Sequence, residues 1–208
     1  MNDSCDAVLA ELDRIGDVGR YIRLREHMAR VDTSFDLSFQ HEYRTYWKMN
    51  VARLGDAFYS EYFSRMESLK TDGIDDIDET IREIALLSDT TERPSLQFSF
   101  ATKLLNTIDA RVPVYDTFVS MFYFFSPPAS DQPVDTRLES LLAFYAFLRG
   151  EYARIIAGGL LDTAINRFRE HYADEPPLCD ERVIDLLLWS FASLMRSGAQ
   201  RRGMMLYH

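Results

Sequence analysis

Residues 96–122 read LQFSFATKLLNTIDARVPVYDTFVSMF. The spacing of the apolar residues in this stretch decides between a helical and a β interpretation. Leu96, Phe98 and Phe100 alternate with polar residues, as they would in a half-buried strand. The apolar residues then recur every three or four positions, which is the α-helical period, at Ala101, Leu104, Leu105 and Ile108. We therefore predict a helix from about Leu96 to Ile108 and no strand in this stretch.

The second half of the stretch predicts another helix. Asp109 and the pair Val112-Pro113 end the first one, because proline disfavours a helical conformation in the residue before it. Asp116 then precedes a very apolar segment that extends to Phe125. An Asp at such a position accepts hydrogen bonds from the free N–H groups of the first turn. We therefore expect an ionised carboxylate that opens the helix.

Helical spacing of apolar residues recurs along the rest of the chain, at residues 6–15, 21–31, 35–69, 77–87, 138–155, 160–171 and 183–195. The aromatic stretch 35–69 predicts one or two long helices. Asp75 or Asp76 is expected to cap the helix that begins at Ile77. Thr136 and Glu139 have the spacing of a capping box, which places the start of the next long helix there. The sequence predicts an all-α bundle or array of about eight to ten helices.

The composition is that of a folded globular domain. The chain has 208 residues, of which 47% are hydrophobic and 13% aromatic, and this is too apolar for a disordered chain. Its length suits one buried core better than two. We predict a single helical domain over residues 1–208, with a flexible, Gly-containing tail at about 197–208.

The sequence shows no targeting or membrane segment. Its first residues carry acids and no basic region before an apolar run, unlike a secretory signal. The longest apolar stretch, around Phe118 to Phe125, is far shorter than the roughly 20 residues of a membrane span. We therefore expect a cytoplasmic protein that does not enter a membrane. Cys5 and Cys179 form no CxxC pair, so we expect two reduced thiols.

The formal charge of −10 is unevenly distributed along the chain. Residues 14–53 contain eight basic and five acidic residues, whereas residues 54–95 contain four basic and eleven acidic ones. A basic face over residues 14–53 is a candidate for contact with DNA or a nucleotide, since phosphate contacts need such a face. The alternative is that both segments form ordinary solvated helix faces.

Several common functional sites are missing from the sequence. It has no Walker A loop, no GxGxxG and no GxSxG motif. The four histidines lie far apart and form no HExxH motif or Cys/His cluster. We therefore predict neither a metal nor a cofactor.

Polar residues within residues 97–122 lie in apolar surroundings. An apolar wall around Lys103 favours its neutral amine, which can act as a nucleophile or base; the alternative is a lysine that extends its amine to solvent. Asp116 is either a helix cap only or also a catalytic carboxylate. Asn106, one turn from Lys103, and Tyr115, which can stack on a base, are candidates for substrate contact. The alternative for Tyr115, and for Trp189, is an aromatic residue of the core.

Two motifs in this stretch resemble those of a known protein family. Ser99-Phe-Ala-Thr-Lys103-Leu-Leu, followed by Pro113-Val-Tyr-Asp116-x-x-Val119, resembles the signature "SFASKLL…P-I-Y/W-D-x-x-V" of a family of uncharacterised bacterial proteins. Trp47 and Trp189, in aromatic helical contexts, look like further members of that pattern. The resemblance adds Ser99 and Trp189 to the candidate substrate-binding residues, and it implies no activity.

The same segment is more distantly similar to the core of the helix-hairpin-helix DNA glycosylases. In these enzymes a "V-D-T-H-V" element follows a helix, and its Asp is catalytic. Val114-Tyr-Asp116-Thr-Phe-Val119 is similar, with one extra residue, so the resemblance implies that Asp116 is the counterpart of that Asp. The "L-P-G-V-G" hairpin has no match before Phe100. Lys103 lies several residues after the nucleophile's position, so the motif assigns it no role.

Two hypotheses follow from the sequence. The first is a DNA-glycosylase-like protein, active or degenerate, that binds a base or nucleotide around Asp116 and Lys103. The second is a non-enzymatic helical module, such as a homodimer, that packs its surplus aromatic residues against a partner. The sequence leaves open whether the chain is an enzyme.

Overall fold

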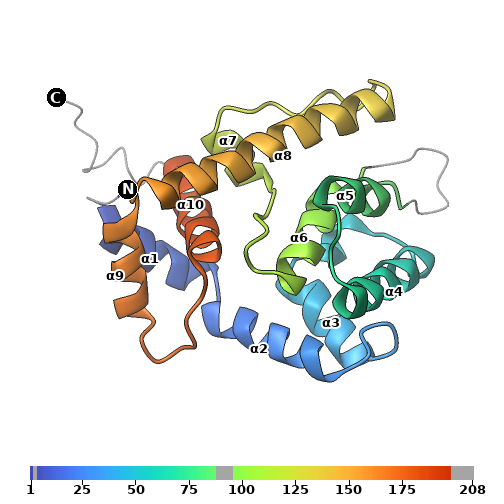
Figure 1. The fold of residues 1–208 in the computed structure, drawn as a ribbon, viewed down its shortest axis with the longest axis horizontal. Helices are drawn as coiled ribbons and strands as arrows, with labels where there is room; N and C mark the ends of the chain where they lie inside the picture. The colour runs from blue at the N-terminus through green and yellow to red at the C-terminus, as the bar shows by residue number, and fades with distance from the viewer. Residues whose placement is uncertain (2–3, 88–95, 198–208) are drawn as a thin grey trace. The chain divides into compact units, whose positions relative to one another are not determined.

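A computed structural model describes residues 1, 4–87 and 96–197 of the chain. In these residues the protein is all-α, with ten α-helices, the 3-10 helix η2 (Met49–Ala52) and no strand (Figure 1). This confirms the predicted fold class and the predicted number of helices. Of the predicted tail, residue 197 closes the last helix, and residues 198–208 lie outside the described residues.

The chain divides into two compact units. Of the described residues, the first unit contains 1, 4–18, 110–127 and 144–197, and the second contains 19–87, 96–109 and 128–143. Helix α8 (Val134–Ala157) contributes residues to both units. The predicted single domain stays a prediction, which an unfolding experiment can test.

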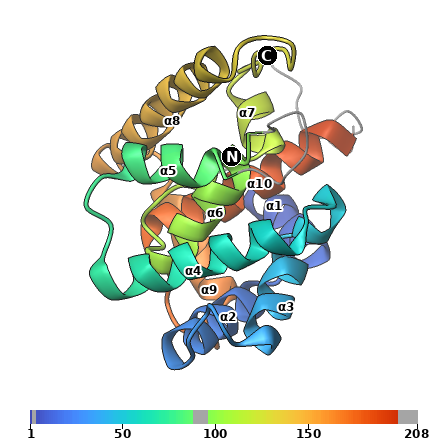
Figure 2. The same ribbon diagram turned by 90° about the vertical axis from the view of Figure 1, so that its right-hand side faces the viewer.

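The second unit is assembled around α6, which packs against α4 and α5 (Figure 2). Its elements are α2 (Val18–Arg30), α3 (Leu37–Tyr46), η2 (Met49–Ala52), α4 (Asp56–Asp72), α5 (Ile77–Ala85), α6 (Phe98–Ile108) and the start of α8. Two cross-links join these helices through tyrosine hydroxyls. The hydroxyl of Tyr62 lies 2.8 Å from that of Tyr43 and also donates a hydrogen bond to the carbonyl of Phe100 at 2.8 Å. These bonds satisfy polar groups that burial would otherwise leave without partners.

The aromatic residues of 35–69 form two helices with a short η2 between them. Lys48 and Arg53, on either side of η2, have φ values of 56° and 53°. A left-handed conformation cannot continue an α-helix of L-residues, because their Cβ atoms come too close to the following carbonyl oxygen. The spacing of apolar residues on either side of η2 does not predict this interruption.

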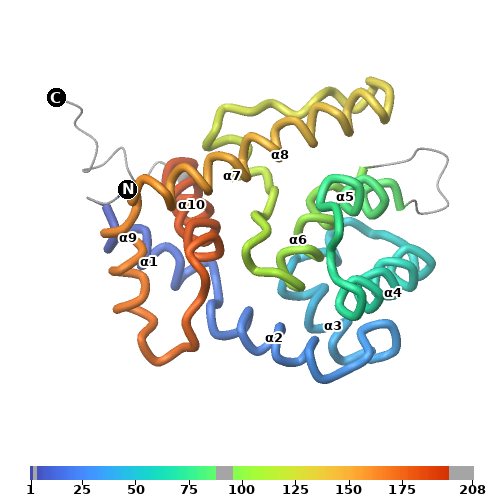
Figure 3. Tube along the Cα trace, viewed as in Figure 1, coloured from blue at the N-terminus to red at the C-terminus, as the bar shows by residue number. Residues whose placement is uncertain are grey.

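In the first unit, α10 (Asp180–Ser197) packs against α1 (Cys5–Ile15), α7 (Thr117–Phe122) and α9 (Asp162–His171) (Figures 1 and 3). Gly16 ends α1 at a close approach: a Cβ on it would lie 2.8 Å from Leu12 Cδ1 and 3.0 Å from the Leu12 carbonyl oxygen. The hydroxyl of Ser190 on α10 donates to the Val8 carbonyl on α1 at 2.6 Å. The end of α9 contacts α1 through His171 and Asp13: Nε2 of His171 lies 2.9 Å from Oδ2 of Asp13.

Helix caps agree with the sequence at two positions and disagree at a third. The side chains of Asp76 and Asp116 cap α5 and α7, as predicted. The capping-box prediction at Thr136 is wrong, because α8 starts at Val134. The first helical hydrogen bond runs from Arg137 N to the carbonyl of Pro133, so Thr136 lies within the first turn of the helix and not before it.

Helix α7 is also shorter than predicted and ends at Phe122 instead of Phe125. Phe124 has a φ of 55°, and the amide of Phe125 turns back to the Ser120 carbonyl at 2.8 Å. These are the features of a left-handed helix end, a position that glycine usually occupies.

Candidate functional site

Asp116 lies at the start of α7 and is half-buried. One carboxylate oxygen accepts a hydrogen bond from the backbone N–H of Val119 at 2.9 Å. Its backbone carbonyl accepts another from Ser120 N at 3.0 Å. The carboxylate is thus held over the first turn of the helix, in an interaction that is strongest when the acid is ionised.

The linker before Asp116 is held by hydrogen bonds to one of its peptide units, the one between Pro113 and Val114. The carbonyl oxygen of Pro113 accepts a hydrogen bond from the hydroxyl of Tyr145 at 2.7 Å. The N–H of Val114, in the same peptide unit, points at both carboxylate oxygens of Asp185, each 3.1 Å away. Both polar groups of this peptide are therefore bound by side chains from α8 and α10.

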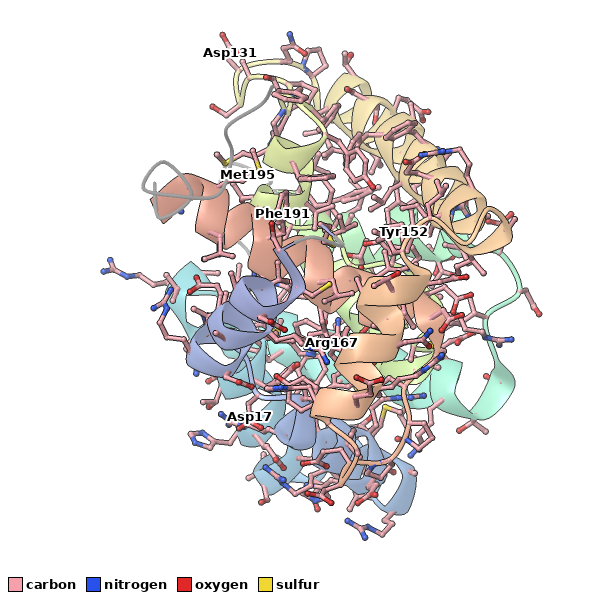
Figure 4. The ribbon with its side chains drawn as sticks, turned by 90° about the vertical axis from the view of Figure 1, so that its left-hand side faces the viewer. Asp17, Asp131, Tyr152, Arg167, Phe191 and Met195 are labelled. Carbon is pink, nitrogen blue, oxygen red and sulfur yellow. The ribbon has the colours of Figure 1, made fainter. Side chains whose placement is uncertain are left out.

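Asp185 is 3% exposed and lies in a buried polar network. The hydroxyl of Tyr152, on α8 (Figure 4), donates to Oδ1 at 2.6 Å, and Nη1 of Arg182 lies 3.4 Å from Oδ2. Burial raises the pKa of the Asp185 carboxyl to about 6, and the nearby charge of Asp116 adds to the rise. The Arg182 guanidinium and the hydrogen bonds from Tyr152 and Val114 act in the opposite direction.

Sequence reasoning missed this network. A signal for it exists, since Asp185 interrupts the apolar run of residues 183–189, VIDLLLW, at a position where a buried residue is expected. A buried acid within such a run needs partners. The sequence does not show that those partners come from α8 and from the linker before Asp116.

Two further candidates, Tyr115 and Trp189, also belong to the first unit. Tyr115 is buried, and its ring packs edge-on against Phe144 with centroids 5.9 Å apart. Burial raises the pKa of its hydroxyl, and a hydrogen bond with Ser120 opposes the shift. Trp189 is half-buried on α10 and packs edge-on against Phe118 at 6.4 Å. Both aromatic residues therefore flank the start of α7.

Lys103, Ser99 and Asn106 lie on α6, in the second unit. The amine of Lys103 lies 3.5 Å from the carbonyl oxygen of Trp47, 5.9 Å from the Trp47 ring and 5.3 Å from the Phe100 ring. Asn106 is fully buried, and its side-chain oxygen accepts a hydrogen bond from the hydroxyl of Tyr21 at 2.9 Å. Ser99 is half-buried, and its carbonyl accepts a hydrogen bond from Thr102 at 3.1 Å. The two candidate catalytic residues thus lie in different units.

The predicted basic face of residues 14–53 contains side chains with different roles. Arg14 belongs to the first unit and forms an ion pair with Glu11 at 2.6 Å. Arg25 is bound to the end of α6, where it donates to the carbonyls of Thr107 at 2.9 Å and Ile108 at 3.2 Å. The exposed cations of this segment in the second unit are Arg23, Arg30, Lys48 and Arg53.

Within residues 1, 4–87 and 96–197, no group of three or more His, Cys, Asp or Glu side chains is arranged to hold a metal ion. In the same residues, no helix has both the length and the apolar character needed to cross a bilayer.

No family model matches the chain, and no match was found among the curated proteins or the solved structures.

Proposed function

We propose that the chain is a DNA-glycosylase-like protein that binds a base or nucleotide, with Asp116 as its central carboxylate. One observation carries the proposal. Asp116 follows a buried, proline-containing linker, begins α7, and has its carboxylate held by the Val119 amide at 2.9 Å. Such a carboxylate can stabilise positive charge that develops on a sugar, or accept a proton from an attacking water.

The reaction would be hydrolysis of an N-glycosidic bond. The oxygen of water bonds to the anomeric carbon of the sugar while the bond to the base nitrogen breaks, and the leaving base nitrogen takes a proton from solvent. Asp116 would take the proton from water. Trp189, which is half-buried, would supply aromatic surface for the base, because stacking accepts any base. Tyr115 is 8% exposed and packs on Phe144, so its part would be to hold the linker and not to stack.

The substitution Asp116→Asn tests the role of the carboxylate. Asn caps helices about as well as Asp, so the variant should keep its thermal stability. It should lose at least about a hundredfold in base release from oligonucleotides with damaged or mismatched bases, which is at the low end for removal of an acid–base catalyst. Asp76→Asn, the equivalent change at the cap of α5, is the matched control and should have no effect on base release. Activity that survives in Asp116→Asn would show that the carboxylate is not catalytic.

Lys103 is the second candidate for a reacting group. Its amine can attack the C1 aldehyde of an abasic sugar and lose water to form a Schiff base, which borohydride reduces to a stable adduct. Wild-type protein should form this adduct with abasic DNA, and Lys103→Gln should not. A Lys103→Gln variant that forms the adduct at the wild-type level would exclude Lys103.

DNA binding tests the first hypothesis as a whole. Phosphate contacts dominate such binding and weaken as salt is added. We expect duplex DNA to bind at about 20 mM salt and to be released at several hundred millimolar. Absence of binding at the lowest salt would rule out the proposed function.

An apolar surface on the first unit favours the second candidate function, a homodimer without catalytic activity. Met121, Phe124 and Phe147 are 52%, 90% and 50% exposed. Met121 lies in the last turn of α7 and Phe124 in the turn that follows it, while the Phe147 ring is 5.4 Å from the ring of Tyr123 in that turn. Exposed apolar patches often mark protein interfaces. Light scattering should show a dimer that Phe124→Ser dissociates; a wild-type monomer would exclude this candidate.

A further inference from the structure

The peptide unit between Pro113 and Val114 is bound at both of its polar groups, and these bonds restrict the chain that carries Asp116. Its carbonyl accepts from Tyr145 and its N–H donates to Asp185. A peptide unit is planar, so bonds at both ends fix its orientation. Asp116 follows after only two residues.

Those two residues have little freedom of their own. Val114 and Tyr115 are 7% and 8% exposed, and the Tyr115 ring packs on Phe144. A close-packed side chain resists rotation of its backbone, because any displacement creates voids or overlaps. The orientation of the peptide before Val114 is therefore transmitted to Asp116.

The capping of α7 does not itself require Asp185. Asp116 alone binds the free amide of Val119. Removing two charges from water costs several kcal/mol per ion, so a buried pair such as Arg182 and Asp185 is weak evidence of added stability.

We propose that Asp185 is a positioning residue for Asp116. Asp185 acts through its hydrogen bond with the N–H of Val114, while Tyr152 holds the Asp185 carboxylate and Tyr145 holds the carbonyl of the same peptide. Its consequence for catalysis rests on the proposed function, whereas the positioning itself is measurable without any substrate. In this role Asp185 touches neither the base nor the sugar.

The test is amide hydrogen exchange in the full chain, followed residue by residue by NMR. In Asp185→Asn, exchange at the Val119 amide should accelerate at least about tenfold relative to the amides of α1 and α10. A merely structural role would accelerate all of these amides together. Asp180→Asn, which changes an acid of the same helix that pairs with Arg169 on α9, is the matched control and should leave Val119 unchanged.

Two further variants keep the test valid if Asp185→Asn does not fold. Tyr152→Phe removes the hydroxyl bound to Asp185, and Tyr145→Phe removes the one bound to Pro113. Each keeps its ring and should accelerate exchange at Val119 severalfold. Unchanged Val119 exchange in the folded variants would overturn the positioning role.

Base release by the same variants separates this proposal from the proposed function. If the wild type releases a base, Tyr152→Phe should lower kcat several-fold with little change in KM, because the carboxylate is displaced while the binding surface remains. If the wild type releases none, the proposed function fails, and amide exchange still decides whether Asp185 positions Asp116.

Discussion

Asp185 carries a charge in surroundings that favour its neutral form. Its carboxyl, with a pKa that burial raises to about 6, is enclosed by Tyr152 and Arg182, and the charge of Asp116 adds to the rise. A raised carboxyl pKa means that the folded protein holds this proton more tightly than the unfolded chain does. The contribution to stability is therefore full below about pH 4 and is lost as the pH rises through about 6.

Asp185→Asn should remove this pH dependence. Between about pH 4 and pH 7, the free energy of unfolding of the variant should rise relative to wild type by up to roughly 3 kcal/mol, at about 1.4 kcal/mol per pKa unit. Urea denaturation of both proteins at several pH values measures the difference. Other acids, such as Glu11 and Glu67, whose pKa values are lowered, are common to both proteins and cancel. Parallel pH profiles would contradict the prediction.

Phe124 stores backbone strain in the turn after α7, since its φ of 55° is unfavourable for a side chain with a Cβ. It is 90% exposed, so its ring adds little by burial. Phe124→Gly should therefore raise the free energy of unfolding by about 1 kcal/mol, measured by urea denaturation. Phe35→Gly is the control: Phe35 is 81% exposed without a positive φ, so the glycine should give no gain there. Equal effects at both positions would contradict the explanation by strain.

At the scale of elements, the side chain of Arg25 links α2 to the end of α6. Carbonyl groups in the last turn of a helix have no partners within the helix, and Arg25 binds two of them. This side chain is therefore committed to the fold, although the sequence places it within a possible DNA-binding face.

Arg25→Met should lower the free energy of unfolding by about 1.5–3 kcal/mol, the range for a hydrogen bond to a charged group. Methionine retains an apolar chain of similar length, so the loss reports on the hydrogen bonds. Arg30→Met changes an exposed arginine at the end of the same helix and should cost less than about 0.5 kcal/mol. Thermal and urea denaturation give both values, and equal losses would refute the structural assignment of Arg25.

At the scale of the whole molecule, the two units are interleaved along the chain. The chain passes from one unit to the other between residues 18 and 19, 109 and 110, 127 and 128, and 143 and 144. The last of these points lies within α8, so unfolding of either unit removes part of a helix that also belongs to the other.

We therefore expect a single cooperative unfolding transition, in agreement with the sequence-based prediction of one domain. Calorimetry should give equal calorimetric and van't Hoff enthalpies, and circular dichroism and Trp fluorescence should give coincident curves. Trp47 reports on the second unit and Trp189 on the first. Separate fluorescence transitions in Trp47→Phe and Trp189→Phe would show that the units unfold independently.

Much of the fold can be predicted from the sequence. The all-α class, the approximate helix number and the caps at Asp76 and Asp116 follow from local rules, because apolar period and capping depend on residues within one or two turns of each other. The same locality explains two failures. The end of α7 depends on a left-handed Phe124, and α8 starts where the Pro133 carbonyl accepts the first helical hydrogen bond; apolar spacing reports neither.

Likewise, one part of the candidate site can be predicted from the sequence and another part cannot. A carboxylate at the start of α7 is readable from PVYD, because the cap and the residues that it caps are neighbours in the chain. Only the tertiary structure decides that Asp185, 71 residues after Val114, binds the peptide before it, and that Arg25 belongs to the end of α6. Hydrogen bonds between distant residues form when packing brings their helices together, and a linear pattern of residue types contains no record of that packing.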